Sequence, residues 1–398
     1  MNHETLWSAV NAHREALVAF TQRLVQTRSP SGQEGDVADL IRAEMERLGY
    51  DEVWIDEAGS VVGRIAGGPG PALILNGHMD HVDAGDPAGW PHPPFGAEIH
   101  DGAIWGRGVA DMKGAVAAMV YAGGLARTLD EPLPGDLYVT AVVQEEIGGL
   151  GARYMAGMLP AAHVVVGEAS ANHLRRGHRG RVELHVHLTG RSVHASMPHL
   201  GANPHFAMAR LVDRLGTLEM PSDPAYGTST VAPTHVEGEP QGANITPSAL
   251  HLVLDWRNVP GESTAEIVAK LESLLAASLT PGCEGSVEIN TRALEAYTGY
   301  RHSYPDEFPS FTTPVDHPWL QSARGALAAA LGRDVEIGTW RFATDGGHFA
   351  EAGATVIGFG PGDDTVVHTV EEHLPIDQLV ESAAGYLVLA LEPRLSLA

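Results

Sequence analysis

Residues 72–83 read ALILNGHMDHVD, an apolar run that ends abruptly in two histidines and two aspartates. A short apolar run of this kind is typical of a strand buried in a sheet. Ligands of open α/β sheets bind beyond the carboxyl ends of the strands, so polar side chains at that position are candidate site residues. The stretch therefore predicts a core strand whose tip carries part of a functional site.

The same pattern of strands extends outward along the chain. Further apolar, partly β-branched runs occur at 61–65, 137–143, 163–167 and 354–359. Apolar positions three and four apart predict helices at 5–27, 34–48, 112–127 and 317–331. Because strands and helices alternate, we expect an α/β domain with helices on both faces of a sheet, built from residues 1–180 and 294–398.

The middle of the chain follows a different order. Strand-like and helical patterns alternate there as strand 182–188, helix 203–216, strands 229–236 and 249–257, helix 263–277 and strand 285–291. This β-α-β-β-α-β order is that of a ferredoxin-like α+β unit. We therefore expect an inserted domain over residues 181–293, which agrees with the two domains that a chain of 398 residues would hold.

Composition excludes several classes of protein. The formal charge of −25 would repel phosphate backbones and anionic membrane surfaces, so we expect neither nucleic acid nor membrane as a partner. The single cysteine, Cys283, excludes an internal disulfide framework and favours a reducing compartment. The sequence shows neither the apolar stretch of a signal peptide nor a run of about 18 apolar residues, and we expect a cytoplasmic protein.

Metal-binding residue types follow four of the expected strands. They are His78 and Asp80, Glu145 and Glu146, Glu168 and His368, and they are joined by Asp111 at the start of the helix at 112–127. Imidazoles and carboxylates without thiolates suit Zn²⁺, Mn²⁺ or Co²⁺. Each residue alone has a simpler interpretation, as a surface histidine, a solvated glutamate or a helix N-cap. Their joint occurrence at four strand ends favours a metal site.

A pair of divalent ions would suit this ligand set. Asp111, Glu146 and Glu168 together with one bridging hydroxide would nearly neutralise two ions. Such a pair can lower the pKa of the bridging water to near neutrality and polarise an amide carbonyl, while a spare carboxylate moves the proton.

Several motifs together resemble one known family. They are NGHMDHV, GRGVADMKG, QEEIGGLG, VVGEAS, VHASMPHLGANP, ANITP, DWRNVPGES, ATDGGHF and GPGDDTVVHTVEE. In this order they resemble the metallopeptidase and amidohydrolase family of acetylornithine deacetylase, succinyl-diaminopimelate desuccinylase, aminoacylase and glutamate carboxypeptidase. The resemblance spans almost the whole chain. It implies a zinc-peptidase-like catalytic domain with a mixed central sheet, and an inserted lid and dimerisation domain.

The resemblance also implies roles for the residues at the strand ends. His78 and Glu168 would bind one metal, Glu146 and His368 the other, and Asp111 would bridge both. Asp80 would orient the imidazole of His78 by accepting its second N–H. Glu145 would be the general base. Two divalent ions are expected per chain, with Zn²⁺ first and Co²⁺ or Mn²⁺ as alternatives.

Substrate-binding residues are implied in the same way. His194 would help to stabilise the oxyanion, while Asn244 and Arg257 would hold a substrate carboxylate. Without the motifs, Arg257 would be interpreted as a surface strand residue and His194 as a loop histidine. Arg179 and the glycine-rich stretch with Thr344, Gly346 and Gly347 are further candidates, and the backbone N–H groups of that stretch could meet an anion. A homodimer through the inserted domain is expected.

Three functions remain open at this point. The first is hydrolysis of the amide bond in a small N-acyl amino acid with a free carboxylate, in the manner of a deacetylase or desuccinylase. His178 stands where the desuccinylase pattern has an arginine, which argues against a strict succinyl-diaminopimelate substrate. The second is a dipeptidase or carboxypeptidase acting on short peptides. The third is an inactive family member that only binds ligand, which the presence of Glu145 and of all five ligands disfavours.

Overall fold

The computed structural model describes residues 3–129, 132–159 and 163–393, and the chain divides into two compact units. Unit 1 comprises the described residues of Met1–Gly177, Ala293–His302 and Phe311–Ala398, and unit 2 comprises His178–Arg292 and Ser303–Ser310. The sequence placed the inserted domain at 181–293. Unit 2 begins three residues earlier than that and also takes in Ser303–Ser310.

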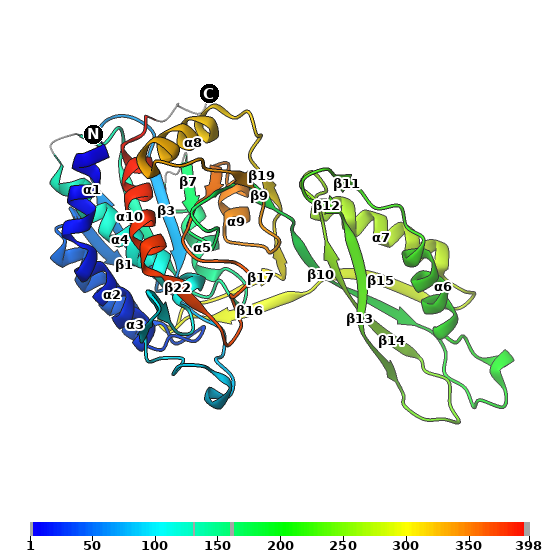
Figure 1. Ribbon diagram of the computed structural model, residues 1–398. Helices are drawn as coiled ribbons and strands as arrows, with labels where there is room; N and C mark the ends of the chain where they lie inside the picture. Colours follow the sequence, from blue (N-terminus) through cyan, green and yellow to red (C-terminus); the bar gives the residue numbers. More distant parts are fainter. Residues whose placement is uncertain (1–2, 130–131, 160–162, 394–398) are drawn as a thin grey trace. The chain divides into compact units, whose positions relative to one another are not determined.

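A mixed sheet of eight strands forms the centre of unit 1 (Figure 1). Its strands, in spatial order, are β1 (Glu52–Ile55), β2 (Val61–Ile65), β6 (Leu137–Val142), β3 (Leu73–His78), β7 (His163–Val166), β21 (Thr355–Gly358), β8 (Leu174–Arg175) and β20 (Ile337–Gly338). Strand β3 runs parallel to β6 and β7, and β21 runs parallel to β7. Strands β1, β2 and β6 pair antiparallel. The expected mixed α/β sheet is confirmed.

Helices cover both faces of this sheet because its central strands are apolar on both sides. Leu73 and Leu75 of β3 belong to one core cluster, whereas Ile74 between them belongs to another. Figure 1 shows α4 and α10 on one side of β3, and α5 and α9 on the other. The helices of unit 1 are α1 (His3–Ala12), α2 (Arg14–Gln26), α3 (Gly35–Arg47), α4 (Gly114–Thr128), α5 (Leu150–Ala156), α8 (Pro318–Leu331), α9 (Gly346–Glu351) and α10 (Ile376–Leu391).

Short elements complete the description of the chain. A three-stranded sheet joins β4 (Ile99–His100), β5 (Ala103–Trp105) and β22 (His373–Pro375). The remaining short strands are β9 (Gly177–His178), β11 (Ser222–Asp223), β12 (Gly227–Thr228), β16 (Thr291–Glu295), β17 (Arg301–Pro305), β18 (Glu307–Phe308) and β19 (Phe311–Thr312), with single helical turns at Pro87–Gly89 and Pro198–Leu200. Within the described ranges, no helix combines the length and the apolar character that crossing a bilayer requires.

Unit 2 has the ferredoxin-like order that the sequence predicted. Its elements are β10 (Arg181–Thr189), α6 (His205–Gly216), β13 (Thr230–Glu239), β14 (Ala249–Arg257), α7 (Thr264–Ser278) and β15 (Glu284–Ile289), and the antiparallel sheet has the order β13-β14-β10-β15. Apolar residues alternate along β10 and β14 and pack against α6 and α7. Helix α7 begins at a capping box in which Ser263 and Glu266 satisfy each other's backbone N–H groups.

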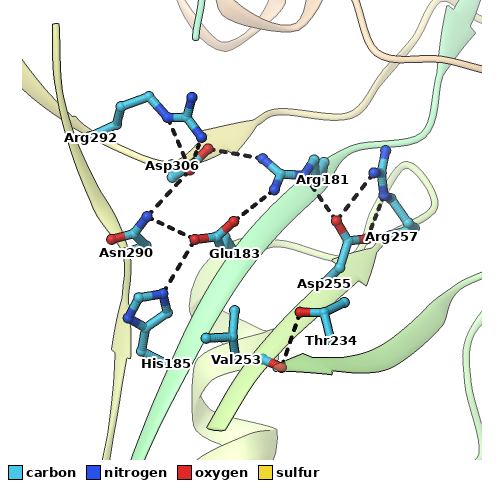
Figure 2. Close-up of polar contacts among 10 residues, drawn as sticks. All are labelled: Arg181, Glu183, His185, Thr234, Val253, Asp255, Arg257, Asn290, Arg292 and Asp306. Atoms are coloured by element: carbon cyan, nitrogen blue, oxygen red, sulfur yellow. Dashed lines mark hydrogen bonds and ion pairs between the residues drawn. The ribbon is translucent and has the colours of Figure 1, made fainter. Parts of the chain in front are cut away.

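A charged network on the sheet of unit 2 explains why Ser303–Ser310 belongs to it (Figure 2). The guanidinium of Arg181 pairs with Asp306 at 2.9 Å and with Asp255 of β14 at 3.0 Å. Arg292 pairs with Asp306 at 2.7 Å. Asp306 is nearly buried, so these partners compensate a charge that would otherwise be expensive to enclose.

Candidate metal centre

Three parallel strands bring most of the predicted ligands to one edge of the sheet in unit 1. His78 is the last residue of β3 and stands opposite Val142 of β6, so Glu145 and Glu146 follow directly beyond that edge. Glu168 follows β7, whose Val166 pairs with Asn76. The carboxyl ends of parallel strands meet at one edge, which is where open α/β sheets bind ligands.

The other two predicted ligands come from segments of irregular backbone. Asp111 lies in the kinked segment Val109–Lys113 that leads into α4, and the bond between Asp111 and Met112 is cis. His368 lies in the loop after β21 and has a φ of +62°, a left-handed conformation that is uncommon outside glycine. Both side chains reach the edge where β3, β6 and β7 end, as the contacts below show.

The five predicted ligands form two histidine–carboxylate groups that share one aspartate. Nε2 of His78 lies 2.9 Å from Oδ1 of Asp111 and 3.6 Å from Oε1 of Glu168. Nε2 of His368 lies 3.0 Å from Oδ2 of Asp111 and 3.1 Å from Oε2 of Glu146. The family resemblance implied the same grouping of the five side chains, and their binding of metal stays a prediction.

Asp80 connects His78 to the neighbouring glutamates. One of its oxygens lies 3.3 Å from Nδ1 of His78, and its backbone carbonyl lies 3.1 Å from the same nitrogen. Its carboxylate also accepts hydrogen bonds from the backbone N–H groups of Glu145 and Glu146, at 3.1 and 3.2 Å, and from the hydroxyl of Ser31 at 2.7 Å. A buried carboxylate behind a ligand histidine fixes the orientation of the ring.

Glu145 lies within the same cluster and is nearly buried. Ligand atoms of Glu145, His78 and Glu168 lie within 4.8 Å of one another. Burial, together with the charges of Asp345, Glu168 and Glu146, raises the pKa of Glu145 well above its usual range, although His78 opposes the shift. Burial and neighbouring carboxylates, above all Asp111, likewise raise the pKa of Glu146 and of Glu168.

These shifts describe a site in which buried acidic groups outnumber the basic ones. Four carboxylates and two imidazoles crowd together, and enclosing carboxylates without counter-charge is unfavourable. Divalent cations would relieve this repulsion, and the donor atoms are those that Zn²⁺, Co²⁺ and Mn²⁺ prefer. The residues present therefore fit a dinuclear metal centre.

Sequence reasoning missed a positioning residue of this site, Glu372. It is fully buried, and its Oε1 accepts hydrogen bonds from the backbone N–H groups of Ala110 and Asp111, at 3.1 and 3.3 Å. Its other oxygen pairs with the buried guanidinium of Arg107 at 2.6 Å. Glu372 thus holds the backbone of Asp111 in place. The motif after His368 contains it, but nothing in that motif indicates that its partner is a backbone far away in the sequence.

Asp345 is a second charged residue that sequence reasoning left without a role. It is nearly buried, and its charge contributes to the raised pKa of both Glu145 and Glu168. Burial raises the pKa of Asp345 itself to about 7. Its neighbours Thr344, Gly346 and Gly347 are buried too, so the candidate substrate loop packs against the interior of unit 1.

The backbone of this loop is already hydrogen-bonded. The N–H of Gly346 donates to the Thr344 hydroxyl at 3.1 Å, and the N–H of Gly347 donates to the Thr344 carbonyl at 3.4 Å. A side chain at Gly346 would come within 2.7 Å of the Phe311 ring, which is a packing reason for glycine at that position. Binding of an anion by these two N–H groups stays a prediction.

The predicted substrate residues of unit 2 lie at opposite ends of its sheet. His194 follows the end of β10, and its neighbour Ala195 donates a backbone hydrogen bond to the carbonyl of Asn244 at 2.9 Å. Thr189 pairs with Ala249, so this end is where β14 begins. Arg257 is the last residue of β14, and nine residues of strand separate the two ends by roughly 27 Å.

The predicted substrate-binding side chains of unit 2 already form ion pairs or hydrogen bonds within the chain. Arg257 pairs with Asp255 at 2.6 Å and remains half exposed (Figure 2). Arg179 donates to the carbonyl of Thr228 at 3.3 Å, and Nδ1 of His194 lies 2.8 Å from the Ser196 hydroxyl. The structure brings His194 and Asn244 together and keeps Arg179 and Arg257 apart from them.

Comparisons with known proteins agree with this geometry. Residues 74–392 match the model of peptidase family M20/M25/M40. A succinyl-diaminopimelate desuccinylase of Cereibacter sphaeroides is 31% identical over 392 residues, covering 93% of this chain and 97% of the relative. An N-formyl-4-amino-5-aminomethyl-2-methylpyrimidine deformylase of Halalkalibacterium halodurans is 29% identical over 417 residues, covering 98% and 97% of the two chains.

Solved structures share the fold. The crystal structure of aminopeptidase PepT from Bacillus cereus superposes with a TM-score of 0.74 at 20% identity, covering 96% of this chain and 98% of that one. The YxeP protein of Bacillus subtilis, described as a dinuclear metal binding peptidase, gives a TM-score of 0.72 at 16% identity, covering 96% and 98%. Because the family match spans most of the sequence and both relatives align over almost their full length, the chain belongs to peptidase family M20/M25/M40.

Proposed function

We propose that this protein hydrolyses the amide bond of a small N-acyl amino acid, using two divalent metal ions and Glu145 as the general base. The observation that carries the proposal is the carboxylate of Asp111, which lies between His78 and His368 and gives one oxygen to each. Such a shared carboxylate suits two adjacent ions. The similar YxeP protein of Bacillus subtilis is a dinuclear metal binding peptidase, which supports the same interpretation.

In this proposal, His78 and Glu168 hold one ion and Glu146 and His368 hold the other, with Asp111 between them. Zn²⁺ is the ion that we expect first, with Co²⁺ and Mn²⁺ as alternatives, because two imidazoles favour these ions over Mg²⁺ or Ca²⁺. When bound, two such ions lower the pKa of a water molecule between them and polarise the amide carbonyl.

Residues of the chain then transfer the proton and hold the metal-binding side chains in place. The carboxylate of Glu145 takes a proton from the attacking water while the oxygen of that water bonds to the carbonyl carbon of the substrate. When the carbon–nitrogen bond breaks, Glu145 returns the proton to the leaving amine nitrogen, which yields a carboxylic acid and a free amino group. A carboxylate placed next to the attacking water can accept and then return a proton in this way. Asp80 meanwhile fixes the ring of His78.

Substrate binding is proposed to involve two chains of a homodimer that pair through unit 2. His194 would help to stabilise the oxyanion, and Asn244 and Arg257 would hold a substrate carboxylate, with Arg179 and the stretch with Thr344, Gly346 and Gly347 as further candidate substrate groups. The opposite placement of these groups supports the proposal, because one β14 strand separates Asn244 from Arg257 by roughly 27 Å. A single small substrate could meet both ends only if they came from different copies.

The names of two relatives favour acyl-group removal over peptide cleavage. One is a desuccinylase and the other a deformylase, and both names describe removal of an acyl group from an amine nitrogen. The identity of the acyl group in this protein is part of the proposal. A panel of N-formyl, N-acetyl and N-succinyl amino acids, with unblocked dipeptides beside them, tests it directly. We expect turnover of N-acyl amino acids, and faster turnover of dipeptides would favour an exopeptidase instead.

The assay needs one matched control. The Glu145→Gln variant keeps the ligand residues but loses the base, so the difference in rate between wild type and variant is the part that depends on Glu145. Activity that is equal in wild type and variant would overturn the proposed role of Glu145.

A further inference from the structure

The outer face of the sheet in unit 2 carries a cluster of three histidines. Along β10, His185 and His187 alternate with Leu184 and Val186, whose side chains are buried against α6 and α7. Because side chains of a strand alternate between the two faces, the histidines lie on the face away from these helices. His251 of β14 stands directly opposite His187 in the strand register, so all three imidazoles share that face.

The three rings pack closely. The ring centroid of His251 lies 4.7 Å from that of His187, with the planes within 3° of parallel, and 4.7 Å from that of His185. One ligand nitrogen from each ring lies within 4.8 Å of the other two. A tetrahedral ion with bonds of about 2.0–2.1 Å spaces its ligand nitrogens at about 3.4 Å, so the side chains would rotate to bring their nitrogens closer around an ion.

One nitrogen of the cluster lacks a partner. Nε2 of His251 is enclosed and has no hydrogen-bond partner among the residues that the structure describes. A buried polar atom without a partner calls for an explanation, and ion binding is one of the recurring ones. A metal ion bound at this nitrogen would satisfy it.

The rings of His187 and His185 each contact a carboxylate. Nε2 of His187 lies 2.9 Å from Oε1 of Glu288, and Nε2 of His185 lies 3.3 Å from Oε1 of Glu183 (Figure 2 for the latter). A carboxylate that accepts the Nε2–H fixes the tautomer and leaves Nδ1 with a free lone pair, which is the arrangement typical of metal-binding histidines.

The carboxylate of Glu183, which contacts His185, is itself held by hydrogen bonds. Glu183 accepts hydrogen bonds from Arg181 at 2.9 Å and from Asn290 at 2.8 Å, as Figure 2 shows. The strands β10 and β14 that carry the rings pair over eight residues. Sites supported by regular strands keep their ligands in place better than sites on loops. At 42% exposure, the side chain of His187 also leaves the cluster open to an ion from solvent.

We propose that His185, His187 and His251 form a third metal site of this protein, which takes one transition-metal ion that prefers imidazole, such as Zn²⁺, Ni²⁺ or Cu²⁺. The site belongs to unit 2 and uses none of the residues around Asp111. Three protein ligands leave a fourth position for water or another donor. The ion would tie β10 to β14 and stabilise unit 2 by mass action.

Metal counting on the full chain tests this proposal. The protein is stripped with a chelator, dialysed against buffered Zn²⁺ and analysed for metal per chain. We expect the His187→Ala and His251→Gln variants each to bind about one ion fewer than wild type, since each removes a ligand from a different strand. The matched control is His100→Ala, because His100 belongs to another group of candidate ligands with His92 and Glu98.

An Asp111→Asn background distinguishes an ion bound at this site from ions bound around Asp111. In an Asp111→Asn background, one ion should remain, and His251→Gln should remove it. Equal metal content in wild type, His187→Ala and His251→Gln would overturn the proposal, as would loss of the extra ion in His100→Ala alone. A rise in the melting temperature of the Asp111→Asn protein with Zn²⁺, absent after His251→Gln, gives a second readout that does not depend on activity.

Discussion

His78 and His368 contact opposite oxygens of a single carboxylate, that of Asp111, at 2.9 and 3.0 Å. The two histidines lie far apart in the sequence, and each also lies near its own glutamate, Glu168 or Glu146. The site is therefore two similar halves that meet at one residue. In the proposed metal centre, Asp111 is the residue that would contact both ions.

The first prediction follows from this sharing. Asp111→Asn should weaken binding of both catalytic ions, whereas His368→Ala should weaken binding mainly of the ion held with Glu146. Metal content after dialysis against a buffered, low free Zn²⁺ concentration distinguishes the two variants. An Asp111→Asn protein that keeps one catalytic ion at wild-type affinity would show that the aspartate is not shared.

The second prediction concerns Glu145. Its replacement by Gln should reduce kcat by about 10²–10⁴-fold, the usual contribution of general-base catalysis, while the metal content stays near that of wild type. Glu146→Gln is the matched control, since the neighbouring residue is a proposed ligand and its loss should reduce metal binding. If Glu145→Gln loses metal as Glu146→Gln does, Glu145 is a ligand instead of the base.

A third prediction tests the homodimer. When His194→Ala and Glu145→Ala chains are mixed, a heterodimer carries both defects at one site and none at the other if His194 acts in the partner's site. Random exchange makes about half of the dimers mixed, so roughly a quarter of the wild-type activity should return. Sedimentation and subunit-exchange measurements provide the control. A mixture that stays inactive after verified exchange, or an active monomer, would contradict the proposal.

The fourth prediction concerns pH and Glu34, which is buried beside Asp80. Burial, and after it the charge of Asp80, raises the pKa of Glu34 from 4.5 to about 7. The folded protein then binds a proton that the unfolded chain releases, so this residue's contribution to the free energy of unfolding falls as pH rises from about 4.5 to 7. In Glu34→Gln, the part of the pH dependence that comes from this residue should disappear. Between about pH 4.5 and 7, that part amounts to up to about 3 kcal/mol in the free energy of unfolding.

Denaturant unfolding of metal-free protein at about pH 5 and about pH 7.5 measures this slope. Glu46→Gln is the control, because Glu46 is an exposed acid on α3, the helix for which Glu34 is the N-cap residue. Equal slopes in wild type and Glu34→Gln would show that Glu34 is ionised in the folded protein throughout this range.

Much of the fold could be predicted because the spacing of hydrophobic residues along the chain differs between strands and helices. Strand β2 occupies the predicted range 61–65, and the predicted strand 249–257 is β14. The expected long helix at 5–27 is two helices, α1 and α2, since the backbone turns at His13. Helix α10 was not predicted; it is largely buried and apolar on most sides, and so lacks a clear polar face.

The proximity of the side chains around Asp111 could be predicted because strand ends and motifs point to it. The supporting residues could not, because their partners are backbone atoms distant in sequence, as for Glu372 and the N–H of Asp111. The histidine cluster of unit 2 illustrates the same limit. The stretch His185-Val186-His187 alternates as any strand does, and only the register between β10 and β14 brings His251 beside it.

Hydrolysis of an N-acyl amino acid by stripped and restored protein tests the central claim most directly. The full chain is freed of metal, assayed with N-formyl, N-acetyl and N-succinyl amino acids, and assayed again as Zn²⁺ is added stepwise. We expect no turnover without metal, recovery as the site around Asp111 fills, and no recovery in Asp111→Asn. Turnover by the metal-free protein at the rate of the restored enzyme would contradict the account.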